Sequence, residues 1–348
     1  MMVGGMGSCI LNLSEIRKEH NELVGKKCAN LGELTAAGFR VPPGFALTVG
    51  AYERFMKETG LESEIAGYLS RHEIDPSTPA GIAEVDKDAE HIRALVESTP
   101  LPADIDEGVR AFYSRLCDEA GAPDAPVSTR SAGPASHPGQ YETYLNVSGA
   151  DEVIRNVRRV WSSTFNTRSI VARHRCGMSL SYDEIGVAVL MMVNAKAAGV
   201  IFTVNPANGD PSKIYIESNW GLGEAVVSGE VSPDSFLLER ETLEIVKSTI
   251  SPKTIWYVPD EGGAVKASPV PEDMKGVASV TGEELRELAQ NAIEIEGHFG
   301  VPQDIEWAVD KDLPFPENVF MLQARPVSKE FEAQSATKRI VGMLSRYI

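Results

Sequence analysis

The sequence predicts an α+β chain folded into two lobes, and three observations lead to this class. With 348 residues, the chain is long enough for two domains or for one large domain split into lobes. In its first half, apolar residues recur at helical spacing over long segments. After Ser181 the pattern changes to short β-type runs separated by Asn, Gly and Pro turns. We therefore expect mixed sheets with flanking helices and a lobe boundary near residues 180–200.

The first half is predicted to be mainly helical. Residues 51–70 and 105–120 have the spacing of helices, and prolines between residues 76 and 102 bracket looser connections. The segment 151–175 places apolar residues on one helical face and carries the densest positive charge of the chain on its other faces. These basic residues are Arg155, Arg158, Arg159, Arg168, Arg173 and Arg175.

The second half is predicted to be rich in strands. VAVLMMV, GVIFTV and KIYIES are short runs typical of strands. Thr281 and Glu284 form a capping box ahead of a helix that continues through Phe299. The runs IEWAV and VFMLQA, joined by a turn rich in Asp and Pro, predict a hairpin.

Composition and charge exclude several classes of partner. The chain is 43% hydrophobic and 24% charged, with a net charge of −17. This balance argues against nucleic acid or an anionic membrane, because both need a positive surface. The four cysteines are widely spaced and are expected to be reduced thiols rather than a disulfide or zinc framework. Without a signal peptide or a run of about 18 apolar residues, the protein is expected to be cytoplasmic.

Common catalytic and phosphate-binding motifs are missing. The chain has no G-x-x-x-x-G-K-[ST], so a P-loop is excluded, and WGLGEAVVSG lacks the third glycine of a dinucleotide-binding turn. There is no G-x-S-x-G elbow, and the histidines are scattered. What remains is a set of separated polar elements. They are VGKKCANLGEL with Lys26 and Lys27, VSTRSAGPASHPGQYETYLNV with Arg130, ESNWGLGEAVVSGEVSPDSF with Glu217, Glu224 and Asp234, and IEWAV with LQARP.

The last of these elements has the composition of a metal site. On paired strands, residues two apart share a face, so Gln323 and Arg325 point the same way, and Glu306 joins them if the register permits. A carboxylate beside an amide oxygen suits Mg²⁺, which keeps phosphate oxygens in its shell. Each element taken alone is also explained by a solvated charge or a polar strand end.

Together and in this order, the elements resemble the N-terminal ATP-binding domain of the phosphoenolpyruvate synthase and pyruvate phosphate dikinase family, an ATP-grasp-like fold. The match extends from about Leu13 to Val327. The resemblance implies a phosphate-clamping lobe over residues 1–195 and a lobe with the Mg²⁺ and ATP site over residues 196–328. A basic tail over residues 329–348 is expected to form a docking helix.

The resemblance also implies a role for each matching residue. Lys27 would hold ATP phosphates, Arg130 would contact the transferring phosphates, and Arg168 would add a second clamp. Glu306 and Gln323 would hold Mg²⁺, and Arg325 would steady the γ-phosphate end. The remaining positions are on the adenine side, with Met192 and Val193 as the hinge and Glu217 as an adenine or ribose contact.

Two features depart from the family pattern. The loop after Arg130 is short, with Pro134, His137 and Pro138 in place of an acidic pair, and the run VLMMV lacks a polar residue before the hinge. His137 is interpreted as a loop residue rather than a phosphocarrier. Loop closure over the phosphates and the choice of acceptor are the functions that these departures affect.

The predicted function is the ATP-binding catalytic subunit of a split dikinase. It would convert ATP to AMP and phosphate and phosphorylate a histidine on a partner subunit, as in phenylphosphate synthase, with phenol or pyruvate as final acceptor. Alternatives are the ATP module of a rifampin-phosphotransferase-type enzyme, a non-catalytic ATP sensor that regulates a partner, or an excised domain of a longer enzyme. The sequence leaves the acceptor, the oligomeric state and the nucleotide preference open.

Overall fold

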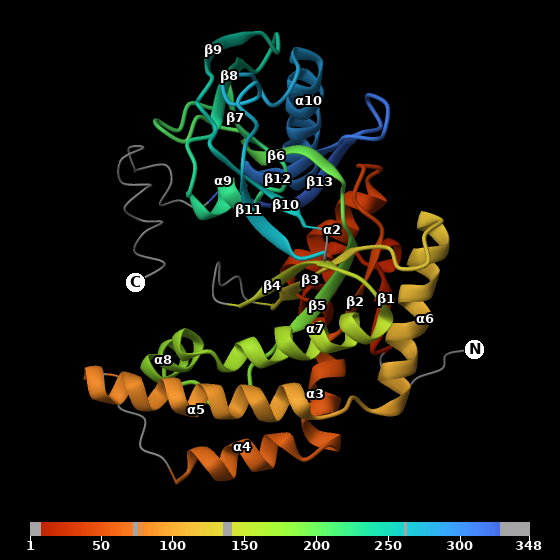
Figure 1. The fold of residues 1–348 in the computed structure, drawn as a ribbon, viewed down its shortest axis with the longest axis vertical. Helices are drawn as coiled ribbons and strands as arrows, with labels where there is room; N and C mark the ends of the chain where they lie inside the picture. The colour runs from red at the N-terminus through yellow and green to blue at the C-terminus, as the bar shows by residue number, and fades with distance from the viewer. Residues whose placement is uncertain (1–7, 72–75, 77, 135–140, 261–262, 328–348) are drawn as a thin grey trace. The chain divides into compact units, whose positions relative to one another are not determined.

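The computed structural model describes residues 8–71, 76, 78–134, 141–260 and 263–327. The predicted docking helix and the loop that holds His137 lie outside these residues. The described chain divides into two compact units (Figure 1). Unit 1 comprises residues 8–33 and 43–192, and unit 2 comprises residues 34–42 and 193–327.

Unit 1 is built on a five-stranded sheet in the order β1-β2-β5-β3-β4. All its neighbouring strands are antiparallel. The strands are β1 (Ile10–Asn12), β2 (Gly44–Leu47), β3 (Val127–Ala132), β4 (Thr143–Val147) and β5 (Gly186–Met191). Its longer helices are α3 (Val49–Glu58), α4 (Leu61–Leu69), α5 (Pro79–Ser98), α6 (Ala103–Ala120), α7 (Ala150–Ser162) and α8 (Thr167–Arg175). Short turns are η1 (Leu13–Glu15), η2 (Lys18–His20), α1 (Asn21–Val24) and η3 (Ser163–Phe165).

The helices cover one face of this sheet. α5 and α7 lie side by side (Figure 1), and Trp161 of α7 is fully buried against the rings of Tyr52 and Phe55. Val127, Val187 and other strand residues complete the same core. Burial of these large apolar side chains stabilises the unit by removing their surface from water.

Three helix predictions for unit 1 need correction. Residues 51–70 form two helices, because Gly60 adopts the left-handed conformation (φ 78°) that ends α3. The segment 151–175 is likewise divided at Asn166, whose extended backbone and side chain cap α8. The region expected to be a loose connection contains the 20-residue helix α5, with Pro79 in its first turn, where a missing N–H does no harm. The helix predicted at residues 105–120 is confirmed as α6.

Unit 2 is built on a six-stranded antiparallel sheet in the order β13-β12-β6-β7-β8-β9. The strands are β6 (Ala195–Phe202), β7 (Lys213–Trp220), β8 (Asp234–Glu239), β9 (Ile245–Thr249), β12 (Gln303–Asp310) and β13 (Val319–Pro326). A separate hairpin consists of β10 (Ile255–Pro259) and β11 (Val265–Pro269). The helices are α9 (Glu224–Ser228) and α10 (Gly282–Phe299). α2 (Lys26–Ala36) begins in unit 1 and contributes Leu34 to the core of unit 2.

The α10 helix covers one face of the six-stranded sheet. Leu288, Ala292 and Ile295 of α10 pack with Ile305 and Trp307 of β12. The predicted capping box is confirmed, because the Thr281 side chain accepts from the Glu284 N–H and the Glu284 carboxylate accepts from the Thr281 N–H. The predicted hairpin is confirmed as β12 and β13.

The predicted α+β class, with helices flanking the sheets, is therefore confirmed. The predicted mixed sheets are antiparallel throughout the named strands. All four cysteines are free thiols. Within the described ranges, no helix has the length and apolar content needed to cross a membrane.

Candidate nucleotide site

The six-stranded sheet of unit 2 has a second face, opposite α10, and this face carries the predicted metal-site residues. Ile305, Trp307 and Val309 of β12 belong to the core beneath α10. Because side chains alternate along a strand, Asp304 and Glu306 point to the other face. We call this second face of the unit 2 sheet the site face.

The central row of the site face holds the predicted metal ligands. Glu306 of β12 lies directly opposite Gln323 of the neighbouring strand β13. On the other side of β12, Glu306 lies opposite Val200 of β6, and Val200 in turn lies opposite Glu217 of β7. One row across four strands therefore contains three of the predicted site residues. Gln323 is buried, whereas Glu306 and Glu217 are half-buried. The Tyr215 hydroxyl donates to Glu217 Oε1 at 3.1 Å.

The next row along the strands contains an ion pair. Asp304 of β12 lies opposite Arg325 of β13, and Arg325 donates from Nε at 3.0 Å and from a terminal nitrogen at 2.7 Å to Asp304 Oδ2. Burial disfavours the charged guanidinium, but Asp304 and the nearby Glu306 outweigh this effect and raise the pKa of Arg325. Arg325 therefore stays charged and is held in place beside the central row.

The sequence analysis did not single out Asp304. The run QDIEWAV does predict Asp304 as a site residue, because it precedes Glu306 by two positions and so shares the same face of the strand. A β-bulge at Leu322 shifts the register after Gln323, so that Trp307 lies opposite Met321. The extra residue leaves the Glu306–Gln323 and Asp304–Arg325 pairs in register.

The third row of the site face is apolar. Ala308 of β12 lies opposite Ala198 of β6 and Phe320 of β13, and these residues form one buried cluster with Val193. The guanidinium of Arg40 stacks over the Phe320 ring at 4.8 Å. The site face therefore changes along its strands from apolar to acidic and then to an arginine.

In unit 1, Arg130 lies on strand β3, and the end of this strand meets the start of α2. Gly25, just before α2, has a φ of 80°, and a Cβ built on it would lie 2.1 Å from the carbonyl oxygen of Ala132. The Lys26 N–H donates to the Gly133 carbonyl at 3.0 Å. Only glycine permits this approach, which joins the VGKK and TRSAG motifs.

Lys27 and Arg130 act on the same buried thiol. Burial raises the pKa of Cys28 to about 12, and the positive charges of Lys27 and Arg130 both oppose this rise. Both cations therefore lie within electrostatic reach of Cys28, which follows Lys27 on α2. Lys27 is half-buried on α2, and Arg130 is half-buried on β3 opposite Ala188 of β5.

Several arginines of the segment 151–175 make contacts that stabilise unit 1 itself. Arg158 donates to the Thr99 carbonyl at 3.1 Å, and the buried Arg173 donates to the Thr164 carbonyl at 2.6 Å. Arg159 stacks over the Tyr144 ring at 4.1 Å. Arg168, the predicted second clamp, is exposed at the start of α8, an element that carries neither Lys27 nor Arg130.

Met192 and Val193 lie where the chain leaves unit 1 and enters unit 2. The Met192 N–H donates to the Pro126 carbonyl at 2.9 Å, within unit 1. Val193 is buried in the apolar cluster at one end of the site face. Their predicted role as an adenine-side hinge stays a prediction.

The residues of the central row fit a magnesium ion. In the described part of the chain, no three His, Cys, Asp or Glu side chains gather to form a metal site of their own. Mg²⁺ is commonly held by only one or two protein oxygens together with water and substrate phosphates. Directly opposed residues have Cβ atoms about 5 Å apart. The carboxylate of Glu306 and the amide oxygen of Gln323 can therefore supply such a pair.

The motifs, the sheets and the site face define a nucleotide-binding domain, and comparisons with known proteins identify its family. Residues 21–343 match the model of the pyruvate phosphate dikinase, AMP/ATP-binding domain. The chain belongs to this family, as its motifs predicted, and is an ATP-binding domain.

Its relatives include several phosphoenolpyruvate synthases. The chain is 38% identical over 322 residues to a probable phosphoenolpyruvate synthase of Methanocaldococcus jannaschii, covering 91% of this chain and 26% of that protein. It is 37% identical to the phosphoenolpyruvate synthase of Aeropyrum pernix, covering 91% and 42%. For the Escherichia coli enzyme the identity is 36%, covering 94% and 43%. The chain thus spans less than half the length of these relatives.

Among solved structures, the chain is similar to the D-alanyl-alanine synthetase A of Vibrio cholerae. The TM-score is 0.29 with 11% sequence identity, over 93% of this chain and 67% of that one. A likeness of this strength adds nothing to the description of the site.

Proposed function

We propose that this domain binds MgATP and transfers a phosphoryl group from it to a histidine outside the described residues. The observation that carries the proposal is the three-row site face, in which an apolar strip, the Glu306–Gln323 pair and Arg325 follow one another. A nucleotide has the same order of properties, from base to triphosphate. Family membership supports ATP as that nucleotide.

Each predicted residue has a role in this proposal. The base lies at the apolar row beside Met192 and Val193, and Glu217 contacts the adenine or the ribose. Glu306 and Gln323 hold Mg²⁺, which neutralises charge on the phosphate oxygens when it is bound. Arg325 steadies the γ-phosphate end. Lys27, Arg130 and Arg168 supply positive charge to the phosphates, with Arg168 as the outer clamp.

The chemistry needs no nucleophile from this domain. Phosphoryl transfer is catalysed mainly by positioning and by stabilising charge on the transferring oxygens. The ion pair with Asp304 fixes the Arg325 guanidinium before the nucleotide arrives, so less ordering remains for the binding step. In this proposal Lys27 and Arg130 both contribute positive charge to the phosphates.

We propose that the accepting histidine belongs to a partner subunit with a phosphohistidine domain and an acceptor site, as in a split dikinase. Two histidines of unit 1 have local structural contacts. His20 accepts the Arg17 N–H at 3.0 Å, and His91 stacks on the Tyr68 ring with centroids 4.4 Å apart. ATP would yield AMP and phosphate, and phenol or pyruvate would be the final acceptor.

Nucleotide binding is tested by calorimetry with MgATP on the wild-type chain and on the variants Glu306→Gln and Arg325→Met. Each variant is expected to bind MgATP on the order of 100-fold more weakly, because Glu306→Gln removes the anionic ligand of Mg²⁺ and Arg325→Met removes a cation that faces the polyphosphate. The matched control is Glu241→Gln, an exposed carboxylate in the turn between β8 and β9, which should bind like the wild type. Absence of binding heat for the wild type, or equal affinities for all variants, contradicts the proposal.

Transfer is tested with γ- and β-labelled ATP and the product of the neighbouring gene. Acid-labile label on a histidine of that protein is the expected result, with AMP formed in proportion. Binding of MgATP without any transfer would favour the alternative of a non-catalytic ATP sensor. Label that passes to a rifamycin instead of to phenol or pyruvate would favour the rifampin-phosphotransferase type.

A further inference from the structure

The strand β4 is the weakly fixed edge of the unit 1 sheet. In the order β1-β2-β5-β3-β4 it has β3 as its sheet neighbour on one side. A register shift interrupts that pairing, because Asn146, in the left-handed region at φ 55°, adds a residue to β4. A bulged edge strand needs other contacts to set its position. Thr143 is the residue of β4 that pairs with Arg130, so the position of β4 bears directly on that arginine.

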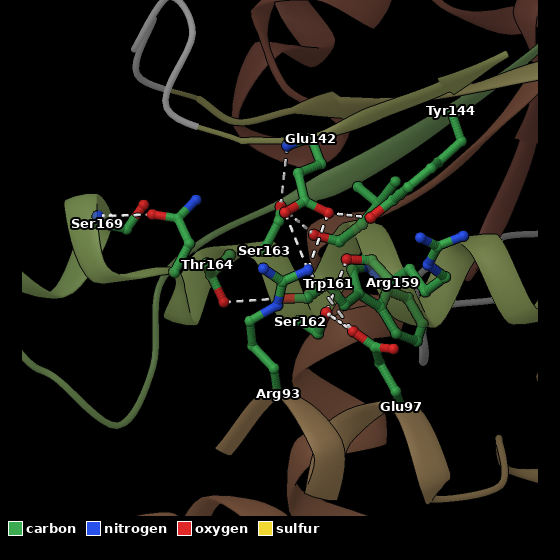
Figure 2. A network of polar contacts seen from close by, with 12 residues as sticks. Arg93, Glu97, Glu142, Tyr144, Arg159, Trp161, Ser162, Ser163, Thr164 and Ser169 are labelled. Carbon is green, nitrogen blue, oxygen red and sulfur yellow. Dashed lines mark hydrogen bonds and ion pairs between the residues drawn. The ribbon is translucent and has the colours of Figure 1, made fainter. Parts of the chain in front are cut away.

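The contacts that set this position converge on Glu142, the residue before β4 (Figure 2). The Arg93 guanidinium of α5 lies 2.9 Å from Glu142 Oε1 and 3.0 Å from Oε2. The Tyr144 hydroxyl donates to the same carboxylate. The Glu142 N–H donates to Ser163 Oγ at 3.2 Å, next to the end of α7. Glu142 therefore joins β4 to two separate parts of the helical layer.

A second set of contacts holds the partners of Glu142 in place. Arg159 of α7 stacks over the Tyr144 ring at 4.1 Å. Glu97 of α5 accepts the Ser162 hydroxyl at 2.6 Å and lies 3.8 Å from Arg93 (Figure 2). The side chains of Arg93 and Glu142 are 28% and 33% exposed, so solvent screens their pairing only in part.

The network and Arg130 lie on opposite faces of the sheet. Tyr144 is opposite Thr129, and Thr143 is opposite Arg130. Since side chains alternate, Glu142 and Tyr144 face the helices, whereas Thr143 and Arg130 face the other way. The backbone of Thr143 and the β3–β4 pairing therefore connect Glu142 to Arg130.

We propose that Glu142 and Arg93 are positioning residues that set the placement of Arg130 from behind the sheet. This inference rests on the proposed function, in which Arg130 contacts the transferring phosphates of ATP. A misplacement of about 1 Å at a phosphate contact is enough to cost up to about 100-fold in rate. Because Arg130 contacts only the phosphates in this proposal, the network should affect binding and transfer of the polyphosphate and not binding of the nucleoside.

The test compares ATP and AMP binding in Glu142→Gln and Arg93→Met, with Arg93→Lys as a milder change that keeps the charge. Both main variants are expected to lose about tenfold in MgATP affinity and less than about twofold in AMP affinity, because AMP lacks the transferring phosphates. Arg93→Lys should lose less than Arg93→Met. The matched control is Arg54→Met, which removes ion pairs with Glu58 of α3 and Asp104 of α6, in the same unit but on neither β4, α5 nor α7.

A double-mutant cycle with Arg130→Met decides whether Glu142 acts through Arg130. If it does, Glu142→Gln changes MgATP affinity by less than about twofold once Arg130 is gone. Equal losses in both backgrounds, or equal losses of ATP and AMP affinity, overturn the inference. Should Arg130→Met weaken MgATP binding while Glu142→Gln does not, the inference fails and the proposed function stands. If neither these changes nor Glu306→Gln affects binding, both fail.

Discussion

The two units hold their candidate site residues in different ways. In unit 2, Glu217, Glu306, Gln323 and Arg325 stand on neighbouring strands of one sheet, and regular strand register alone brings them into two rows. In unit 1, Lys27 comes from a helix and Arg130 from a strand. The backbones of their two motifs meet at Gly25, where only glycine allows so close an approach.

The two sets of residues should respond differently to a local disturbance of the structure. A row of side chains on a sheet depends on many ladder hydrogen bonds, so a disturbance two strands away has little effect on it. A pair of cations whose placement depends on one close backbone approach is displaced when that single contact is lost. We therefore expect unit 2 to lose stability before it loses its site geometry, and unit 1 to show the opposite order.

The largest predicted effect is on the stability of unit 2. Lys253 and Asp234 are fully buried, with Lys253 Nζ 2.5 Å from Asp234 Oδ1, and Asp234 also accepts the Ser279 N–H at 2.9 Å. Lys253→Met leaves a buried carboxylate without its cation and should lower the free energy of unfolding by about 3–5 kcal/mol. β6 and β7 separate β8 from the predicted Mg²⁺ ligands on β12 and β13, and only Glu217 lies on the strand next to β8, so MgATP affinity should change by less than about threefold. Denaturant unfolding and calorimetry measure the two quantities.

The control for this experiment removes both charges. Asp234→Asn combined with Lys253→Met should regain much of the lost stability, since no unpaired charge stays buried. A loss of MgATP affinity as large as the loss of stability would contradict the expected order for unit 2. The geometry of the site face would then depend on distant contacts.

A smaller stability effect with a larger binding effect is predicted for Gly25→Ala in unit 1. The new Cβ meets the Ala132 carbonyl, and the φ of 80° is strained for alanine, so unfolding should become easier by about 2–4 kcal/mol. MgATP affinity should fall about tenfold or more, because Lys27 and Arg130 are displaced together. Gly121→Ala is the matched control. Its φ is 64° and nothing lies within 4 Å of the new Cβ, so it should cost about 1 kcal/mol and leave binding unchanged.

The smallest predicted effect is a pH-dependent one in unit 2. Burial alone would raise the pKa of Glu284, but Lys196 Nζ at 2.6 Å and the Thr281 N–H at 2.8 Å outweigh it, so the pKa is lowered. A lowered pKa in the folded state adds stability at neutral pH that is lost as the pH falls below the ordinary value of 4.5. Glu284→Gln should therefore cost about 1 kcal/mol at pH 7 and almost nothing near pH 3.

Unfolding curves at several pH values measure this difference. Glu283→Gln, an exposed neighbour in the same helical turn, is the control and should show no comparable dependence. If the difference in unfolding free energy between the wild type and Glu284→Gln stays constant across the pH range, packing rather than charge holds α10 against β6.

Much of the fold was predictable from local pattern, and the errors have physical causes. The alternation in IEWAV and VFMLQA gave the β12–β13 hairpin, and Thr281 with Glu284 gave the start of α10. The division of residues 51–70 was missed because Gly60 also fits inside a helical pattern. Pro79 was interpreted as a breaker although it stands where helices accept proline.

The sequence by itself determined the α+β class, the family and the alternation that places Gln323 and Arg325 on one face, because these depend on neighbours within a few residues. Only the tertiary structure decided that Glu306 lies opposite Gln323, that Asp304 pairs with Arg325, and that Lys26 meets Gly133 beyond Arg130. Strand register and close backbone approach join residues far apart in the chain. They are set by the packing of whole sheets and helices, which no short stretch of sequence contains.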